Sequence, residues 1–165
     1  MKRKGLEALL GELGFLDDPE CSDTAARFAE VLREYAPKGA PPKLDTFVAP
    51  GRDRVMFRDL PFHSLCAHHL LPFHGTADVA YLPGAWGRIA GLGGVARALK
   101  HLSRQPQLQE RLGAQLADYL HAELGGPVAV RLRARQMCME MRGAESAGTI
   151  ETLALRGDAS EGLFG

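Results

Sequence analysis

The spacing of apolar residues predicts two short helices at the start of the chain. The first contains four leucines three to four residues apart, Leu6, Leu9, Leu10 and Leu13. We expect Gly14 to end this helix. Ser22-Asp23-Thr24 offers N-cap oxygens for a second helix. Its apolar stripe is Phe28, Val31, Leu32 and Tyr35. A loop rich in Pro and Gly is expected at 37–42.

Between residues 54 and 82 the pattern is typical of strands. Val55, Phe57 and Leu60 open this region, and 74–82 is rich in residues that favour β structure. The intervening segment 62–73 fits neither the helical nor the strand period, and it concentrates histidine and cysteine. An irregular segment of that composition between two strands indicates a functional role.

The second half of the chain predicts two helices followed by two strands. Gly91 to Gly94 lead into a helix whose inward residues are Val95, Leu99 and Leu102. A longer helix has leucines four residues apart, Leu108, Leu112, Leu116 and Leu120, and ends at Gly125-Gly126-Pro127. Residues 128–135 alternate strictly, with arginines on the polar side, and 149–156 is a last predicted strand. This order predicts an α+β fold: an antiparallel sheet with two helices packed on one face, preceded by N-terminal helices.

Length and charge narrow the possible functions. The 165 residues fit one domain, 1–165, with an N-terminal helical segment at 1–40 and a core at 54–165. Lys plus Arg and Asp plus Glu number 20 each, so no overall field attracts nucleic acid. No apolar run approaches the ~20 residues that span a bilayer, and no secretory signal is visible. We expect a cytoplasmic protein that binds neither nucleic acid nor membrane.

A candidate metal site lies in the irregular segment. Cys66-Ala67-His68-His69 is a C-x-x-H arrangement, which lets two ligands from one turn reach one ion. Zinc accepts thiolate and imidazole ligands readily, and a catalytic site needs three protein ligands and an open position. Either Cys21 or Cys138 could supply the third. The motif alone is weak, because cysteine is often buried simply as a small apolar residue. His63 and His74 are interpreted as ordinary surface or packing residues.

Several long motifs resemble the GTP cyclohydrolase I family. The segment FHSLCAHHLLPFHGTADVAYLPG resembles its signature, S-x-C-E-H-H-L-x-P-F-x-G-x-A-x-V-A-Y-x-P. The segments that resemble further family motifs, in the family's order, are 23–27, 89–97, 104–120, 128–143 and 153–157. The resemblance therefore spans nearly the whole chain. It implies the tunnelling fold, and a homodecamer of two stacked pentamers whose strands close a barrel.

The resemblance also implies a reaction and the residues that perform it. The implied enzyme is a zinc-dependent hydrolase that opens the guanine imidazole ring of GTP at C8, releases formate and forms 7,8-dihydroneopterin triphosphate. Cys138 matches the third zinc ligand beside Cys66 and His69, and His68 matches a histidine that contacts substrate and assists proton transfer. The residues that match substrate-binding positions are Glu110 and Gln109 at the guanine N–H edge, and Arg27, Arg97 and Arg142 at the triphosphate.

Four residues near this implied site depart from the family pattern. Gln136 takes the catalytic position of a histidine, and glutamine forms hydrogen bonds but does not titrate. Gly93 and Gly94 replace a serine and a lysine near the phosphates, and Ala67 replaces a glutamate. Losing a general acid–base residue costs roughly 10²–10⁴ in rate.

These departures leave three hypotheses. The first is a complete GTP cyclohydrolase I reaction. The second is a diverged zinc hydrolase of the same fold, which acts on a related purine nucleotide or stops at ring opening. The third is an inactive homologue that binds a purine or pterin. An open zinc position argues against the third, because a pure binder has little need of it.

Overall fold

The computed structural model describes residues 4–36 and 39–165. The chain forms two compact units, Met1–Ala36 and Pro37–Gly165. The expectation of a single domain stays a prediction. Residues 37 and 38 of the expected loop lie outside the described residues.

The first unit contains the two predicted N-terminal helices. Its elements are α1 (Lys4–Glu12), η1 (Phe15–Asp17), η2 (Pro19–Cys21) and α2 (Thr24–Glu34). Gly14 follows α1 with a φ of 75°, a conformation that glycine adopts without a steric penalty. Asp23 precedes α2, but its side chain makes no capping hydrogen bond. Its carboxylate instead lies 3.7 Å from the Arg27 guanidinium, so the expected capping by this residue is not formed.

The second unit is built on a five-stranded sheet. Its elements are β1 (Thr46–Val48), β2 (Val55–Cys66), β3 (Pro72–Tyr81), β4 (Arg88–Ala90), α3 (Leu92–Ser103), β5 (Pro106–Gln107), α4 (Gln109–Leu124), β6 (Val128–Gln136), α5 (Met137–Glu140), β7 (Thr149–Arg156) and η3 (Glu161–Phe164). The main sheet has the order β5-β2-β3-β6-β7, and β1 pairs with β4 in a separate small sheet.

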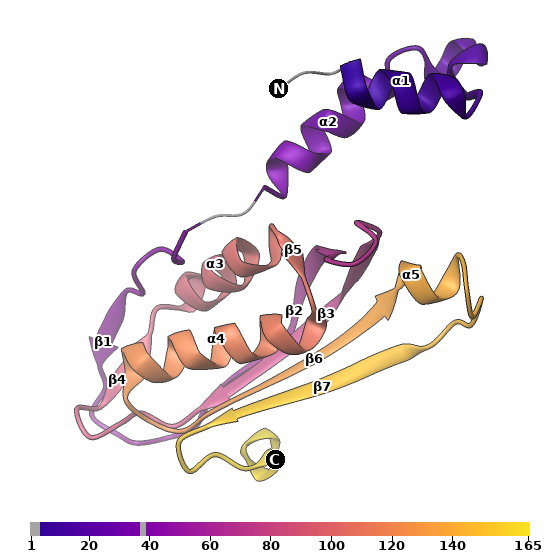
Figure 1. The fold of residues 1–165 in the computed structure, drawn as a ribbon. Helices are drawn as coiled ribbons and strands as arrows, with labels where there is room; N and C mark the ends of the chain where they lie inside the picture. Colours follow the sequence, from indigo (N-terminus) through magenta and orange to yellow (C-terminus); the bar gives the residue numbers. More distant parts are fainter. Residues whose placement is uncertain (1–3, 37–38) are drawn as a thin grey trace. The chain divides into compact units, whose positions relative to one another are not determined.

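The main sheet is antiparallel except at one edge, where the short β5 runs parallel to β2. Helices α3 and α4 lie next to one another and cover one face of it (Figure 1). The predicted α+β fold with two helices on one face is therefore confirmed.

The core lies between this helix layer and the sheet. Leu112, Leu116 and Leu120 of α4 are fully buried, and they face the buried side of β6. The alternate positions of β6 carry the arginines on the opposite face, where Arg133 lies 2.9 Å from the buried Asp78. The strict alternation read from the sequence thus separates the core from a polar, ion-paired face.

The segment 62–73 is more regular than expected. Strand β2 continues through Cys66, and β3 begins at Pro72, so only the residues between them form a turn. Within β2, Phe62 and Ser64 are buried whereas His63 is exposed and pairs with His74 of β3. The interpretation of the whole segment as irregular was wrong because pairing along β3 extends the strand regardless of its polar composition.

The end of the chain packs on the sheet face opposite the helices. In η3, Leu163 and Phe164 pack against Ala80 and Ala129. The Arg131 guanidinium lies 4.3 Å from the centre of the Phe164 ring, a cation–π distance. These contacts hold η3 against strands β3 and β6.

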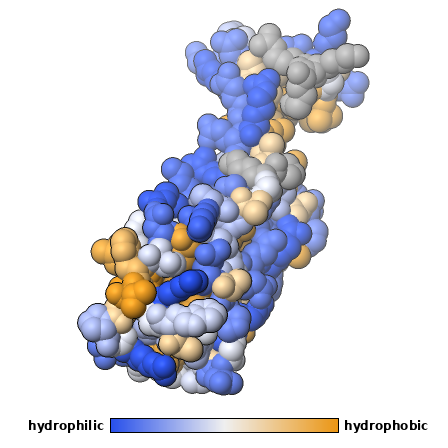
Figure 2. All heavy atoms as spheres, turned by 90° about the vertical axis from the view of Figure 1, so that its left-hand side faces the viewer, coloured by the Kyte–Doolittle hydropathy of each residue, from blue (hydrophilic) through white to orange (hydrophobic). Residues whose placement is uncertain are grey.

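Apolar side chains remain exposed where β1 and β4 lie. Val48, Leu92, Trp86 and Phe47 are between 60% and 79% exposed. Figure 2 looks onto this side and shows apolar atoms at the surface. Contiguous exposed apolar surface of this kind marks contacts with other proteins. Among the described residues, no helix is long and apolar enough to cross a membrane.

Candidate metal centre and adjoining pocket

The turn after β2 holds the first two candidate metal ligands together. The Cys66 carbonyl accepts hydrogen bonds from the backbone N–H groups of His69 at 3.3 Å and Leu70 at 2.8 Å. The Cys66 N–H donates to the Leu71 carbonyl at 2.8 Å, which closes the turn. Leu70 adopts a φ of 54°, a conformation that reverses the chain. As a result, His69 Nδ1 lies 3.8 Å from Cys66 Sγ.

The third candidate ligand lies just after the end of β6, two strands away from β2 in the sheet. Strand β6 runs antiparallel to β3 and pairs Gln136 with Phe73. The single turn of α5 follows at once and contains Cys138. One ligand atom each from Cys66, His69 and Cys138 lies within 4.8 Å of the others. Among the described residues, the group that could hold a metal includes Cys138 and not Cys21.

The electrostatics of this cluster suit a cation. Burial raises the pKa of the Cys138 thiol, and the adjacent Cys66 thiol raises this pKa further, whereas Arg142 lowers it. Two neighbouring thiols resist ionisation unless a positive charge compensates them. Two sulfur atoms and one imidazole are the donors that zinc prefers. The residues present therefore fit a zinc ion with three protein ligands.

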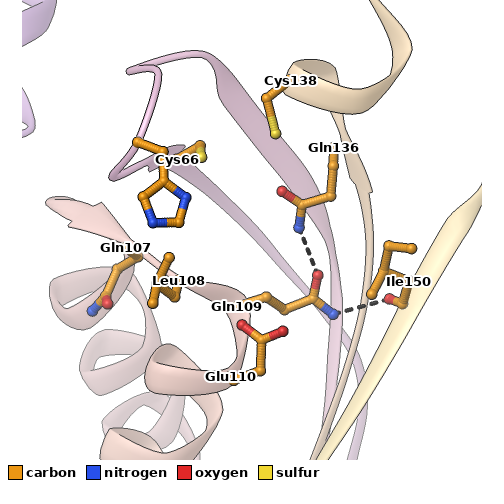
Figure 3. Close-up of a pocket in the computed structure, with 9 residues that line it drawn as sticks. Cys66, Gln107, Leu108, Gln109, Glu110, Gln136, Cys138 and Ile150 are labelled. Atoms are coloured by element: carbon orange, nitrogen blue, oxygen red, sulfur yellow. Dashed lines mark hydrogen bonds between the residues drawn. The ribbon is translucent and has the colours of Figure 1, made fainter. Parts of the chain in front are cut away.

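A cavity of about 250 Å³ opens beside the cluster. The predicted site residues among those that line it are Cys66, His68, Gln109, Glu110, Gln136 and Cys138 (Figure 3). They come from the end of β2 and the turn that follows it, the first residues of α4, the end of β6, and α5. Folding thus brings two metal-ligand candidates and four further predicted residues around one cavity.

The start of α4 supplies contrasting groups to the cavity. Glu110 is exposed in the first turn of the helix, where its carboxylate is available to a ligand. Gln109 is only 3% exposed and accepts a hydrogen bond from Gln136 Nε2 at 2.7 Å. Sequence reasoning missed three further lining residues, Gln107, Leu108 and Ile150. For Gln107 and Leu108, the signal was their position directly before the predicted substrate-binding pair.

Two of the predicted phosphate-binding arginines, Arg97 and Arg142, do not line this cavity. Arg97 lies on α3, exposed, with its guanidinium 3.0 Å from the Asp45 carboxylate. Arg142 follows α5 and is exposed, close enough to Cys138 to lower the pKa of that thiol. Arg27 lies in the first unit. Within the second unit, Arg97 and Arg142 therefore do not line the cavity, although Arg142 lies near one of the candidate metal ligands.

The two glycines at the start of α3 differ in their surroundings. A Cβ atom at Gly93 would lie 2.8 Å from Arg97 Nη1, the tip of an exposed side chain. A Cβ atom at Gly94 would lie 2.6 Å from Leu44 Cδ1. Leu44 is 2% exposed and belongs to the core. Leu44 thus fills the space where a side chain at residue 94 would begin.

Comparison with known proteins identifies the family. Residues 3–162 match the sequence profile of GTP cyclohydrolase I. The chain belongs to the GTP cyclohydrolase I family. It is 46% identical over 140 residues to GTP cyclohydrolase 1 of Streptococcus gordonii, a match that covers 80% of this chain and 74% of that protein. Its identity to GTP cyclohydrolase 1 of Mycobacterium leprae is 39% over 162 residues, which covers 92% and 79%.

Membership of the GTP cyclohydrolase I family confirms the resemblance drawn from the motifs and makes the chain an enzyme of this type. The cavity beside Cys66 and Cys138 is consequently the candidate active site, because it combines the candidate metal ligands with a histidine and an exposed carboxylate.

Proposed function

We propose that this enzyme opens the guanine imidazole ring of GTP at C8, releases formate and forms 7,8-dihydroneopterin triphosphate. The observation that carries the proposal is the cluster of Cys66, His69 and Cys138 at the edge of a cavity that also presents His68 and Glu110. The relatives named GTP cyclohydrolase 1 support the same substrate.

Cys66, His69 and Cys138 would hold a zinc ion. Their donor atoms and their close spacing support this assignment. A zinc ion with three protein ligands and an open position supplies Lewis acidity and lowers the pKa of water to roughly 7.

The other cavity residues are assigned by their chemistry. Glu110 presents carboxylate oxygens, which accept hydrogen bonds from the N1–H and exocyclic amine of guanine. His68 lines the cavity and carries the imidazole that moves protons during the reaction. Arg142, with Arg97 and Arg27, would hold the triphosphate, because guanidinium groups bind phosphate oxygens through paired hydrogen bonds.

We further propose a homo-oligomer, a decamer of two pentamers, in the cytoplasm. Arg97 does not line the cavity of its own chain, which supports a site completed by neighbouring subunits. The exposed Val48, Leu92 and Trp86 supply apolar surface for such contacts. Light scattering or native mass spectrometry measures the assembly directly. A monomer that turns over GTP would contradict the shared-site proposal.

Gln136 favours one second candidate. The residue lines the cavity but exchanges no proton, so a reaction that relies on proton transfer at this position would stop at ring opening. The product would then be a formamide derivative of the opened purine rather than a pterin. A related purine nucleotide as substrate belongs to this same alternative.

One experiment separates these functions. Zinc-loaded protein is incubated with GTP, and formate release is followed together with pterin fluorescence. Both signals are expected for the proposed function. A formamide product without formate, or turnover of another purine nucleotide offered in place of GTP, supports the second candidate. Binding of GTP without turnover of any of these nucleotides contradicts both.

A further inference from the structure

The side-chain amide of Gln109 has a fixed orientation. Its Nε2 lies 3.1 Å from the Leu132 carbonyl oxygen, 2.9 Å from the Ile150 carbonyl oxygen and 3.3 Å from Thr152 Oγ1. Backbone carbonyl oxygens only accept hydrogen bonds, so the nitrogen of this amide has to face them. With the side chain 3% exposed, a reversed amide would bury unsatisfied oxygen atoms against the sheet.

This orientation determines the orientation of Gln136. Gln109 Oε1 is left facing Gln136, and an amide oxygen attracts only a donor. Gln136 therefore turns its Nε2 toward Gln109, at 2.7 Å. Its own Oε1 points away from Gln109, toward the side of the cavity on which Cys66 lies (Figure 3). The carbonyls of Leu132 in β6 and Ile150 in β7 thus orient the Gln109 amide, which in turn orients the Gln136 amide. As a result, this wall of the cavity presents a hydrogen-bond acceptor.

We propose that Gln136 Oε1 accepts a hydrogen bond from the substrate and that Gln109 is the positioning residue that holds it in this role. The inference rests on the proposed function and adds a specificity rule to it. The wall at residue 136 accepts hydrogen bonds but takes up no proton, so it selects a substrate that presents an N–H or O–H donor at the contact. A neutral histidine that donates to Gln109 would present the same acceptor.

The proposal also changes the role of Gln109. Its Nε2 donates to the Leu132 and Ile150 carbonyls and to Thr152 Oγ1, and its Oε1 accepts from Gln136 Nε2. Its side chain acts on the substrate through Gln136 instead of through its own donors. Glu110, the next residue, is exposed and free of this network.

The first test changes residue 136 in the full, zinc-loaded protein. Gln136→Met removes the acceptor at similar side-chain length, and we expect about a tenfold loss of kcat/KM for formate release from GTP. Gln136→His, assayed at about pH 8 where an ordinary histidine is neutral, is expected to recover most of that loss. Gln115→Met is the matched control, because Gln115 accepts a comparable bond and does not itself line this cavity. Its donor Gln107 does line the cavity, but keeps its hydrogen bonds with the Leu102 carbonyl and Arg111. A Gln136→Met enzyme as active as the parent would overturn the acceptor role.

The second test measures the coupling of the two glutamines. Gln109→Met should lower kcat/KM as much as Gln136→Met, and the double variant should lose no more than either single variant. Losses that multiply would overturn the positioning role. If Gln109→Met does not fold, the comparison of the Met and His variants at residue 136 still decides the acceptor role.

A third measurement separates failure of this inference from failure of the proposed function. The melting temperatures of the two single variants and the double variant form a second cycle, which reports the Gln109–Gln136 contact without any substrate. Non-additive shifts are expected if the amides are coupled. A parent protein that releases no formate and binds no GTP would contradict the proposed function. Additive melting shifts would contradict the coupling of the two amides alone.

Discussion

The cavity beside Cys66 and the first turn of α3 are organised in opposite ways. Around the cavity, side chains from β2, α4, β6 and α5 converge, and Gln109 and Gln136 are hydrogen-bonded to one another. In the first turn of α3, two glycines replace side chains, and the nearby Arg97 pairs with Asp45 in solvent. The candidate metal ligands and the cavity residues therefore converge within one chain. Arg97 does not line that cavity, so any contact it makes with a substrate phosphate lies beyond the cavity lining.

The largest effect should come from the metal cluster. We expect Cys138→Ser to lower formate release by at least about a thousandfold, because a lost Lewis acid removes several kcal/mol of transition-state stabilisation. Bound zinc, measured by mass spectrometry, should fall in parallel. Chelation of the parent's metal should reproduce the loss, and added zinc should reverse it.

Cys21→Ser is the matched control for this substitution. Cys21 lies outside the cluster, in the first unit, so its removal should leave zinc content unchanged. Loss of zinc from the Cys21→Ser protein would mean that the two units share the metal site. The metal site would then not be complete within the second unit, and the contrast between the cavity and the first turn of α3 would no longer hold.

The second-largest effect should come from the exposed carboxylate of the cavity. Glu110→Gln replaces a charged acceptor by a neutral amide, and we expect kcat/KM for GTP to fall about 10- to 100-fold. Glu123→Gln changes the same residue type near the other end of α4 and should leave kcat/KM within experimental error. Equal losses in both variants would show that the helix responds to charge in general, and not to a contact at its start.

The sequence predicted the elements of the fold better than the contacts within the cavity. The helix with Leu112, Leu116 and Leu120 and the alternating strand 128–135 were readable because periodic burial determines both. The C-x-x-H turn was readable because its ligands are neighbours in the chain. The choice of Cys138 over Cys21 required the family resemblance, since spacing carries no information about which distant segment closes the cluster.

The hydrogen bonds of Gln109 were not readable from any local pattern. They join residues 23, 27, 41 and 43 positions away in the chain, and depend on the register of β6 and β7 against α4. The packing of Leu44 against Gly94 has the same origin. Tertiary register, not residue type, fixes both the polarity of the cavity wall and the space at the start of α3.

A smaller effect is expected at the exposed arginine of α3. Arg97→Ala should raise the dissociation constant for GTP about tenfold if its guanidinium contacts a phosphate, because charge-assisted hydrogen bonds contribute about 1.5–3 kcal/mol before solvent screening. Guanosine, which lacks phosphates, should bind both proteins equally in calorimetry. Lys100→Ala, which removes another exposed cation of α3, is the control. Weaker binding of guanosine as well would assign Arg97 a structural role and weaken the contrast between the two regions.

The smallest effect concerns stability at the two glycines of α3. Alanine in a helix is favoured over glycine by roughly 0.5–1 kcal/mol. At Gly93 the new Cβ meets only the mobile tip of Arg97, so Gly93→Ala should be neutral or slightly stabilising. At Gly94 it meets the buried Leu44, and overpacking of a core costs about 1–3 kcal/mol. We therefore expect Gly94→Ala to be less stable than Gly93→Ala by about 1–3 kcal/mol in denaturant unfolding.

A change in Leu44 tests the cause of that difference. In a Leu44→Ala background the contact at 2.6 Å is removed, so Gly94→Ala should become stabilising by the ordinary helix preference of about 0.5–1 kcal/mol. If Gly94→Ala destabilises both backgrounds equally, Leu44 is not what closes this position. If the dependence on Leu44 holds, a lysine at residue 94 cannot be introduced without repacking the core. The first turn of α3, which the family resemblance places near the substrate phosphates, then lacks that charge, whereas all three candidate metal ligands are present.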